Sequence, residues 1–341
     1  MTEIIKKTSL NLAQLKQPVV VTGALGFIGK RTIHALLELG ANDIVAFDLP
    51  GQTLPVEWAG KVRYEAGDIS QHAAVDKAMK NAGTVIHLAA MVGDWIPLAQ
   101  HEKVTIDGSR FIFAAALENN TRVVLASSIV VYGDQLTNGA CPEDKKWGKS
   151  VGAYSFCKQK QEKLAWEYHE QHRMPLSVVR PANVYGPGSR PWVDQVIETL
   201  EIGTPMLING GDFNAALVHV DNVVQMLLLA ATKDEALGQA FNGGDGNTTT
   251  WLRYFSDLSN ACSLPAPKSV PLWIVGPLSF MMEKTWRFLN IKTRPPLTKE
   301  ALNIVSAETT IPITKAERLM GYHPKISYAE GLKQVQDYLK P

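Results

Sequence analysis

The sequence has few of the residues that mark disulfide scaffolds, zinc proteins and nucleic-acid binders. Its 341 residues include only three cysteines, Cys141, Cys157 and Cys262, which form neither a CxxC pair nor an even-numbered framework. We therefore expect neither a disulfide scaffold nor a metal site. Lys and Arg number 34 against 33 Asp and Glu, so no excess of positive charge indicates nucleic-acid binding.

Long hydrophobic runs are also missing. No stretch reaches the ~18 apolar residues that a membrane-spanning helix needs. The first 18 residues, MTEIIKKTSLNLAQLKQP, contain neither an uninterrupted apolar core nor a small-residue cleavage site, so no secretory signal is predicted. With 45% hydrophobic and 20% charged residues, the composition is that of a folded globular protein. These properties predict a reduced, cytoplasmic protein.

What the chain does contain is an alternation of short β-branched runs with longer segments of helical period. Near-continuous apolar strands that alternate with helices predict a parallel sheet covered on both faces. The predicted fold class is α/β, a doubly wound parallel Rossmann sheet with a smaller C-terminal substrate lobe. The expected strands are 19–21, 44–47, 62–64, 85–88, 123–126, 177–179 and 240–242, and the expected helices are 28–39, 73–81, 98–118, 154–171 and 223–231.

The regular alternation ends after Pro181, where glycine and proline become frequent and the elements shorten. We therefore expect residues 1–182 to form the Rossmann domain, to which residues 219–246 return. Residues 183–218 and 247–341 would form the substrate-binding lobe over the C-terminal edge of the sheet. Ligands of open α/β sheets bind at that edge.

A glycine-rich turn follows the first predicted strand, in the order Gly23-Ala-Leu-Gly26-Phe-Ile-Gly29. The first glycine permits a tight turn, the second lets the backbone approach a pyrophosphate, and the third lets the helix pack against the strand. The free N–H groups of the following helix also favour a phosphate. The motif predicts dinucleotide binding, although a glycine triplet alone also occurs in ordinary tight turns.

The residue at the end of the second predicted strand indicates which dinucleotide is bound. Asp48 lies 19 residues after Gly29, where a carboxylate accepts hydrogen bonds from ribose hydroxyls. Leu-Pro-Gly follows it without an arginine to bind a 2′-phosphate, so NAD is favoured over NADP. Lys30 and Arg31 lie close enough to the turn to leave NADP open as the alternative.

A tyrosine and a lysine, Tyr154 and Lys158, share one face of a predicted helix. The lysine is expected to stabilise the phenolate and to lower the tyrosine pKa from its usual value of about 10. The tyrosine could then act as a general base for an alcohol or a general acid for a ketone. A serine of the pair Ser127-Ser128, where a predicted strand runs into a loop, could bind the substrate oxygen. Taken alone, these patterns also fit an exposed helical pair and an ordinary loop serine.

Over nearly its whole length the chain resembles the extended short-chain dehydrogenase/reductase superfamily, of the NAD-dependent epimerase/dehydratase type. Eight pieces in the right order are far more specific than any one of them. The pieces are TGALGFIG (22–29), Asp48, GDI (67–69), HLAA (87–90), SSIVVYG (127–133), YSFCK (154–158), RPANVYGPG (180–188) and VHVDNV (218–223).

The resemblance implies roles for individual residues. Ser128, Tyr154 and Lys158 take the catalytic roles, with Ser127 as the alternative if the loop register differs by one. Many relatives carry an asparagine where this chain has Thr105, so Thr105 is given no catalytic role. The residues implied around the cofactor are Gly23, Leu25, Gly26, Phe27, Ile28, Gly29, Asp48, Asp68, Ile69, Leu88, Ala89, Ala90, Tyr154, Lys158, Pro181, Asn183 and Val184.

The resemblance also bears on the substrate. Nucleotide-sugar enzymes resembling UDP-galactose epimerase carry an arginine that meets the diphosphate of the substrate, and Ala215 stands at that position. Segments 269–282, 294–300 and 313–324 instead resemble the 3β-hydroxysteroid and sterol dehydrogenase branch, and relatives that reduce long-chain β-keto acids.

We therefore expect an NAD-dependent oxidoreductase that interconverts a secondary alcohol and a ketone on a small hydrophobic substrate. A nucleotide-sugar epimerase or dehydratase is the alternative, and a reductase of aromatic ketones and a non-catalytic NAD-responsive regulator also stay open. Each tryptophan proposed at the substrate also fits simple packing. The predicted substrate-binding residues are Val92, Trp95, Ser128, Tyr154 and Trp192.

Besides the substrate, a second copy of the chain is expected as a partner, and a membrane contact stays open. The resemblance implies a homodimer in which helices 98–118 and 154–171 pair with their two-fold mates. Residues 270–282 form an apolar run without charge, about 20 Å long as a helix and too short for a ~30 Å bilayer core. This run is either buried core or, through residues 270–288, a peripheral membrane contact.

Overall fold

The computed structural model describes Leu10 and residues 12–340, and the structural statements below concern these residues. The predicted absence of a secretory signal falls mainly on residues outside this part of the chain.

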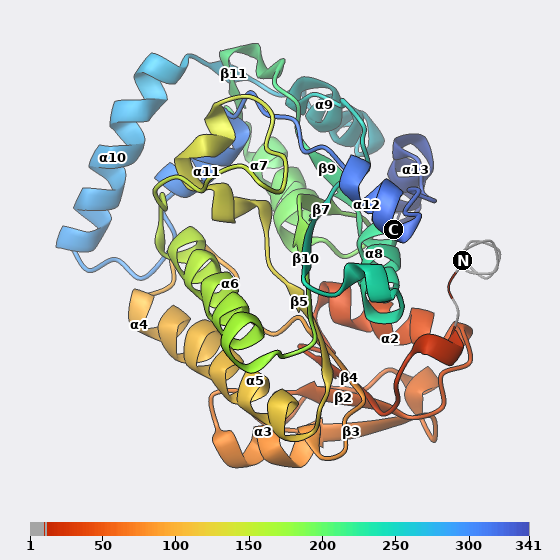
Figure 1. Ribbon diagram of the computed structural model, residues 1–341. Helices are drawn as coiled ribbons and strands as arrows, with labels where there is room; N and C mark the ends of the chain where they lie inside the picture. Colours follow the sequence, from red (N-terminus) through yellow and green to blue (C-terminus); the bar gives the residue numbers. More distant parts are fainter. Residues whose placement is uncertain (1–9, 11, 341) are drawn as a thin grey trace.

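A seven-stranded parallel sheet forms the centre of the molecule, in the order β10-β6-β5-β4-β1-β2-β3 (Figure 1). The chain runs outward from β1 to β3, crosses back to β4 and then runs outward to β10, so the strand order reverses between β1 and β4. This arrangement confirms the predicted doubly wound α/β fold. The strands are β1 (Val19–Thr22), β2 (Ile44–Asp48), β3 (Val62–Ala66), β4 (Thr84–His87), β5 (Arg122–Ala126), β6 (Leu176–Pro181) and β10 (Gln239–Gly243).

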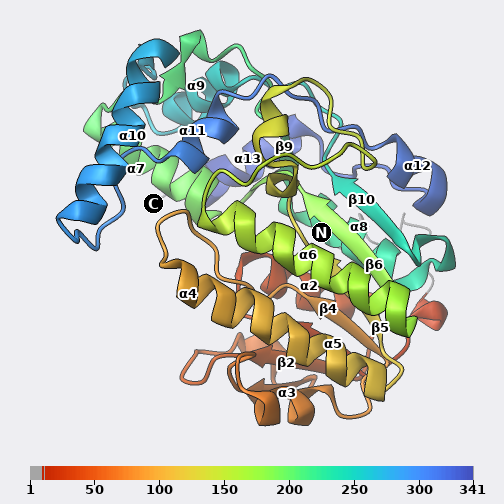
Figure 2. The ribbon, with the colours of Figure 1, turned by 60° about the vertical axis from the view of Figure 1, so that its left-hand side comes forward.

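Helices cover both faces of the sheet because its central strands are apolar at successive positions (Figure 2). Val19 and Val21 pack in one core with α2 and α8, whereas Val20 packs in a second core with α3, α5 and α6. The alternation of side chains along a strand therefore builds two hydrophobic layers. These helices are α2 (Phe27–Glu38), α3 (His72–Met79), α5 (Gly108–Glu118), α6 (Ala153–His172) and α8 (Val220–Thr232).

The helix predicted over residues 98–118 is not uniform. It begins as α4 (Leu98–His101), widens into the π-helical segment η3 (Glu102–Asp107) and continues as α5. Thr105 lies in η3, and its Oγ1 accepts a hydrogen bond from the Met91 N–H at 3.1 Å. A π-helical turn of this kind often lies at a functional site. Here the Thr105–Met91 hydrogen bond connects the turn to the loop after β4.

The smaller lobe lies above the C-terminal edge of the sheet and has an aromatic core that includes Tyr185, Trp251 and Tyr254. Two short parallel strand pairs, β7 (Asn183–Tyr185) with β9 (Leu217–His219) and β8 (Leu207–Ile208) with β11 (Ser269–Val270), belong to this region. Its helices are α7 (Gln195–Ile202), α9 (Trp251–Ala261), α10 (Leu272–Phe288), α11 (Lys299–Val305) and α13 (Tyr328–Leu339).

One C-terminal helix, α12 (Thr314–Met320), packs with the core of α2 and α8 rather than with the aromatic core of the lobe. The predicted division into two domains stays a prediction. Within the described residues, no helix is long and apolar enough to cross a membrane. The remaining short helical segments are η1 (Leu12–Gln14), η2 (Val56–Trp58), η4 (Ile129–Thr137), η5 (Arg190–Asp194), η6 (Asn209–Gly211) and η7 (Asp234–Ala236).

Candidate active site

The glycine turn between β1 and α2 brings three pieces of backbone into close contact. Gly23 has φ +66°, and a Cβ there would lie 3.1 Å from the Ala89 Cα. A Cβ on Gly29 would lie 2.1 Å from the Gly23 carbonyl oxygen, so only glycine fits at this position. Gly26 precedes α2 and has no side chain to cap it, which leaves the first helical N–H groups for an anion. The geometry suits a pyrophosphate.

Asp48 lies beside this turn, at the end of β2. Its Oδ2 accepts a hydrogen bond from the Leu25 N–H at 2.7 Å, and its Oδ1 accepts one from the Leu49 N–H at 2.7 Å. A carboxylate fixed in this way retains lone pairs for ribose hydroxyls. Arg31 on α2 lies 3.7 Å from the Asp221 carboxylate. This carboxylate, rather than Asp48, offsets part of the positive charge of Arg31.

The ends of β3 and β4 complete the same edge. Asp68 accepts a hydrogen bond from the Ser70 N–H at 2.8 Å, and Ile69 is buried beneath Gly108, where a Cβ would lie 2.8 Å from its side chain. After β4, the N–H groups of Leu88 and Ala89 both donate to Thr22 Oγ1 at 3.1 Å. The predicted cofactor residues from four strands therefore lie along one edge.

Tyr154 and Lys158 lie one turn apart near the N-terminus of α6, where Lys158 is buried and Tyr154 is half-buried. The Lys158 Nζ donates to the Ala126 carbonyl at 2.9 Å and to Gln161 Oε1 at 3.0 Å. Burial lowers the pKa of Lys158 to about 8, and the negative charge of Glu162 opposes this shift.

The expected lowering of the Tyr154 pKa is wrong. Burial raises that pKa to about 12, a hydrogen bond with Ser128 opposes the shift, and the charge of Glu300 adds to it. The ammonium of Lys158 donates its hydrogen bonds to Ala126 and Gln161 rather than to the Tyr154 hydroxyl. Desolvation of the phenol therefore dominates the Tyr154 pKa.

The two adjacent serines after β5 make different contacts. Ser127 Oγ donates to Glu162 Oε2 at 2.5 Å and is thereby engaged in a buried ionic cluster. Ser128 caps η4, accepting a hydrogen bond from the Val130 N–H at 3.3 Å, and its hydroxyl lies close enough to Tyr154 to oppose the rise of the Tyr154 pKa. This arrangement favours Ser128 over Ser127 as the residue beside the reacting oxygen.

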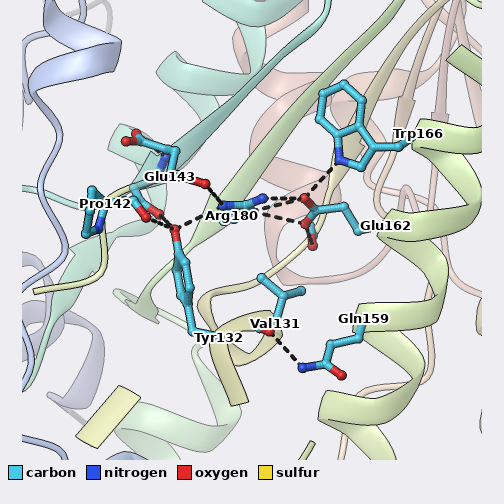
Figure 3. Close-up of polar contacts among 10 residues, drawn as sticks. Val131, Tyr132, Pro142, Glu143, Gln159, Glu162, Trp166 and Arg180 are labelled. Carbon is cyan, nitrogen blue, oxygen red and sulfur yellow. Dashed lines mark hydrogen bonds and ion pairs between the residues drawn. The ribbon is translucent and has the colours of Figure 1, made fainter. Parts of the chain in front are cut away.

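A buried ion pair between Arg180 of β6 and Glu162 of α6 lies next to this group (Figure 3). The Arg180 Nη2 lies 2.7 Å from Glu162 Oε1, and the two side chains are 5% and 0% exposed. Arg180 Nη1 also donates to the Tyr132 hydroxyl at 3.0 Å, and Trp166 Nε1 donates to Glu162 at 3.2 Å. The cluster fixes α6 against the sheet and against η4.

Glu300, which sequence reasoning missed, lies at the start of the same helix. Its Oε1 accepts a hydrogen bond from the Ser155 N–H at 2.6 Å, and a Cβ on Gly152 would lie 2.2 Å from its Oε2. Burial raises the pKa of this carboxyl. Glu300 belongs to α11 in the C-terminal half, 145 positions from Ser155, so no local sequence pattern predicts the contact.

The remaining predicted residues are dispersed. Asn183 donates through Nδ2 to the Ala215 carbonyl at 2.7 Å, next to Pro181 and the half-buried Val184. Trp192 packs on Trp251 with ring centres 5.1 Å apart, and so contributes to the core of the lobe.

The loop after β4, which contains the other two predicted substrate residues, contacts the C-terminal half. Val92 is exposed, and the Arg287 guanidinium lies 5.4 Å from the Trp95 ring centre. Asp94 accepts two hydrogen bonds from Arg294 at 2.6 Å. This ion pair connects the loop to the segment that precedes α11.

The chain is similar in sequence and in structure to known proteins. A family model described as NAD dependent epimerase/dehydratase family matches residues 19–244. The chain is 24% identical to 3beta-hydroxysteroid-dehydrogenase/decarboxylase isoform 2 of Arabidopsis thaliana, over 93% of this chain and 61% of that protein. It is 23% identical to 2-alkyl-3-oxoalkanoate reductase of Stenotrophomonas maltophilia (strain K279a), over 93% and 98% of the two chains. The solved structure of MoeE5 in complex with UDP-glucose and NAD has a TM-score of 0.73 and 26% identity, covering 94% and 98%.

Proposed function

We propose that the substrate of this chain is a hydrophobic secondary alcohol or ketone. The premise is that the chain belongs to the NAD dependent epimerase/dehydratase family and hence to the extended short-chain dehydrogenases/reductases. Membership makes the chain an NAD-dependent oxidoreductase acting on CH–OH groups. The observation that carries the proposal is the group of Ser128, Tyr154 and Lys158, the first and last of them buried, at the same edge of the parallel sheet as the glycine turn.

The residues around the turn fit NAD. The backbone between Gly23 and Gly29 and the start of α2 would hold the pyrophosphate, and Asp48 would accept hydrogen bonds from the adenosine ribose. Lys158 would donate to the hydroxyls of the nicotinamide ribose. When bound, NAD supplies a nicotinamide ring that accepts or donates a hydride.

The protein's own part is to orient the substrate and to move a proton. Ser128 would hold the substrate oxygen, and Tyr154 would take the hydroxyl proton during oxidation or return it during reduction. Because burial raises the pKa of Tyr154 to about 12, the positive charge of Lys158 would have to act directly on the hydroxyl for a phenolate to form near neutral pH.

Two observations support a hydrophobic substrate over a nucleotide sugar. Ala215 is fully buried, and its carbonyl accepts the Asn183 side chain, so this position offers no cation to a diphosphate. The two relatives named above have sterol-type and 2-alkyl-3-oxoalkanoate substrates in their names. The bound UDP-glucose of MoeE5 supports the alternative, a nucleotide-sugar epimerase or dehydratase.

Substrate assays decide between the two. We would follow NADH formation from NAD with a 3β-hydroxysteroid, a long-chain 2-alkyl-3-hydroxyalkanoate or UDP-glucose, and follow epimerisation of UDP-glucose separately. Turnover of either apolar substrate is the expected result. Turnover of UDP-glucose alone would overturn the proposal in favour of the nucleotide-sugar alternative.

The preference for NAD gives a prediction. NADH is expected to bind at least about tenfold more tightly than NADPH, because the Asp48 carboxylate repels a 2′-phosphate. Asp48→Asn should narrow that ratio, whereas Asp43→Asn, at the exposed other end of β2, should leave it unchanged. Fluorescence titration with both reduced cofactors measures the ratio. Equal or tighter NADPH binding by the wild type would mean that Arg31 outweighs Asp48.

Helix α10 supports a route for a sparingly soluble substrate. Trp273 and Phe288 are 77% and 88% exposed, and only Val275 and Ser279 of this helix are buried. The helix lies on the outside of the lobe (Figures 1 and 2). Arg287 joins it to the loop after β4 through Trp95. We propose that this apolar face rests on an anionic lipid surface, with Lys284 and Arg287 near the headgroups.

Vesicle binding tests this proposal. The protein should co-sediment with vesicles that contain anionic lipid, and Trp273→Glu/Phe288→Glu should reduce the bound fraction at least about tenfold. Both side chains are exposed, so the variant should keep its unfolding midpoint. Val56→Glu, at an equally exposed apolar residue far along the sequence, is the matched control. Equal sedimentation of the two variants would exclude α10 as the contact.

A further inference from the structure

A continuous line of buried side chains runs from Lys158 to the end of β1. Gln161 Oε1 accepts a hydrogen bond from Lys158 Nζ at 3.0 Å, and Gln161 Nε2 donates to Ser109 Oγ at 2.8 Å. Ser109 Oγ lies 2.9 Å from His87 Nε2, and His87 Nδ1 lies 2.7 Å from Thr22 Oγ1. All five side chains are buried, and they come from α6, α5, β4 and β1.

The contacts of Thr22, at one end of this line, determine which atom carries each hydrogen along it. Thr22 Oγ1 already accepts from two backbone N–H groups, so its single hydrogen goes to His87 Nδ1. The imidazole then carries its hydrogen on Nε2 and donates to Ser109. Burial, assisted by the charge of Lys158, lowers the pKa of His87 to about 3, which agrees with a neutral ring.

The same reasoning fixes the orientation of the glutamine. Ser109 Oγ donates its own hydrogen to the Thr105 carbonyl at 2.5 Å, so it can only accept from His87 and Gln161. Gln161 must therefore present its amide nitrogen to Ser109 and its oxygen to Lys158. Together with the Ala126 carbonyl, that oxygen occupies two of the three N–H groups of Lys158, leaving the third for a ligand.

We infer that Gln161 is a positioning residue that holds the Lys158 ammonium toward the cofactor and Tyr154, and that Ser109, His87 and Thr22 anchor it to the strand before the glycine turn. This inference rests on the proposed function of Lys158. Gln161 touches neither reacting group in this role and acts through the lysine.

The charges around Lys158 make the role measurable. Glu162 faces it from α6, the rings of His87 and His101 face it from β4 and α4, and Tyr154 lies one turn away. Glu162 is paired with Arg180, and burial lowers the pKa of both histidines. A carboxylate in place of the Gln161 amide would therefore add a negative charge in direct contact with the Lys158 ammonium and would offset part of its positive charge.

Three variants test the inference, Gln161→Leu, Gln161→Glu and Gln159→Leu. Gln159 is the matched control, because it is a buried glutamine on the same helix that donates to the Val131 and Gly148 carbonyls instead. Gln161→Leu should weaken NADH binding about tenfold and lower kcat similarly, since Lys158 loses an acceptor. Gln159→Leu should lower only the unfolding midpoint.

Gln161→Glu should change the pH profile of oxidation of a 3β-hydroxysteroid by NAD. The added charge reduces the stabilisation of the Tyr154 phenolate, so activity should fall off at a pH about one unit higher than in the wild type as the pH is lowered. NADH affinities and a pH profile like those of Gln159→Leu would overturn the inference. If the wild type binds NADH but oxidises no such alcohol, the proposed function fails, and the NADH titrations still decide the role of Gln161.

Discussion

Tyr154→Phe is expected to lower kcat about a thousandfold and to leave NADH binding within about twofold of the wild type. The substitution removes the hydroxyl that would exchange a proton with the substrate, a contribution of about 10²–10⁴ in rate. It keeps the ring, the helix and Lys158, so the contacts expected to hold the cofactor remain. Steady-state turnover of a 3β-hydroxysteroid and fluorescence titration of NADH measure the two effects separately.

Tyr185→Phe is the matched control for this experiment. Tyr185 is fully buried, and its hydroxyl has no hydrogen-bond partner among the described residues. Its loss should leave kcat close to that of the wild type. If Tyr154→Phe instead retained more than about a tenth of the wild-type kcat, Tyr154 would not be the acid/base group.

Arg180→Met is expected to destabilise the fold by about 3–5 kcal/mol, because it leaves the buried Glu162 carboxylate without its cation. Arg180 also donates to Tyr132 and to the Glu143 carbonyl, so three elements lose a shared anchor (Figure 3). Urea unfolding followed by circular dichroism measures the free energy. Helix α6 should become the first region to exchange its amide hydrogens.

Two further variants show whether burial is the cause. Arg190→Met removes one partner of the Arg190–Glu198 pair, whose side chains are 60% and 51% exposed, and should hardly move the urea midpoint. Arg180→Met/Glu162→Leu removes both buried charges and should recover much of the lost stability. If Arg180→Met were as stable as Arg190→Met, the buried pair would not be what holds α6 to the sheet.

The sequence alone was sufficient for the sheet and for the glycine turn, because both depend on neighbouring residues. Apolar residues at successive positions require burial on both faces, which predicts central parallel strands. The Gly23–Gly29 turn could be predicted because Gly26 and Gly29 pack against the backbone of Gly23 within seven residues, although the contact of Gly23 with Ala89 exists only in the folded chain. Asp48 and the Tyr154–Lys158 pair followed from spacing in a strand and a helix, and their catalytic roles stay predictions.

Other parts of the site depend on residues that only the folded chain brings together. Glu300 reaches the start of α6 from 145 positions away, and the line from Lys158 to Thr22 crosses four elements. The widening of the long helix at Glu102–Asp107 is likewise not visible in its periodicity. None of these features follows from a regular spacing of residues in the sequence, so none could be predicted from it.

The choice between Ser127 and Ser128 shows most clearly what each level determines. The sequence places two serines after an apolar strand and so predicts a hydroxyl at the binding edge of the sheet. Successive side chains of an extended segment point in opposite directions, so only one of the two can face Tyr154. The tertiary structure decides which one, because the buried Glu162 lies on the side of Ser127 and accepts its hydroxyl hydrogen, while the Ser128 hydroxyl lies close enough to Tyr154 to oppose the rise of its pKa.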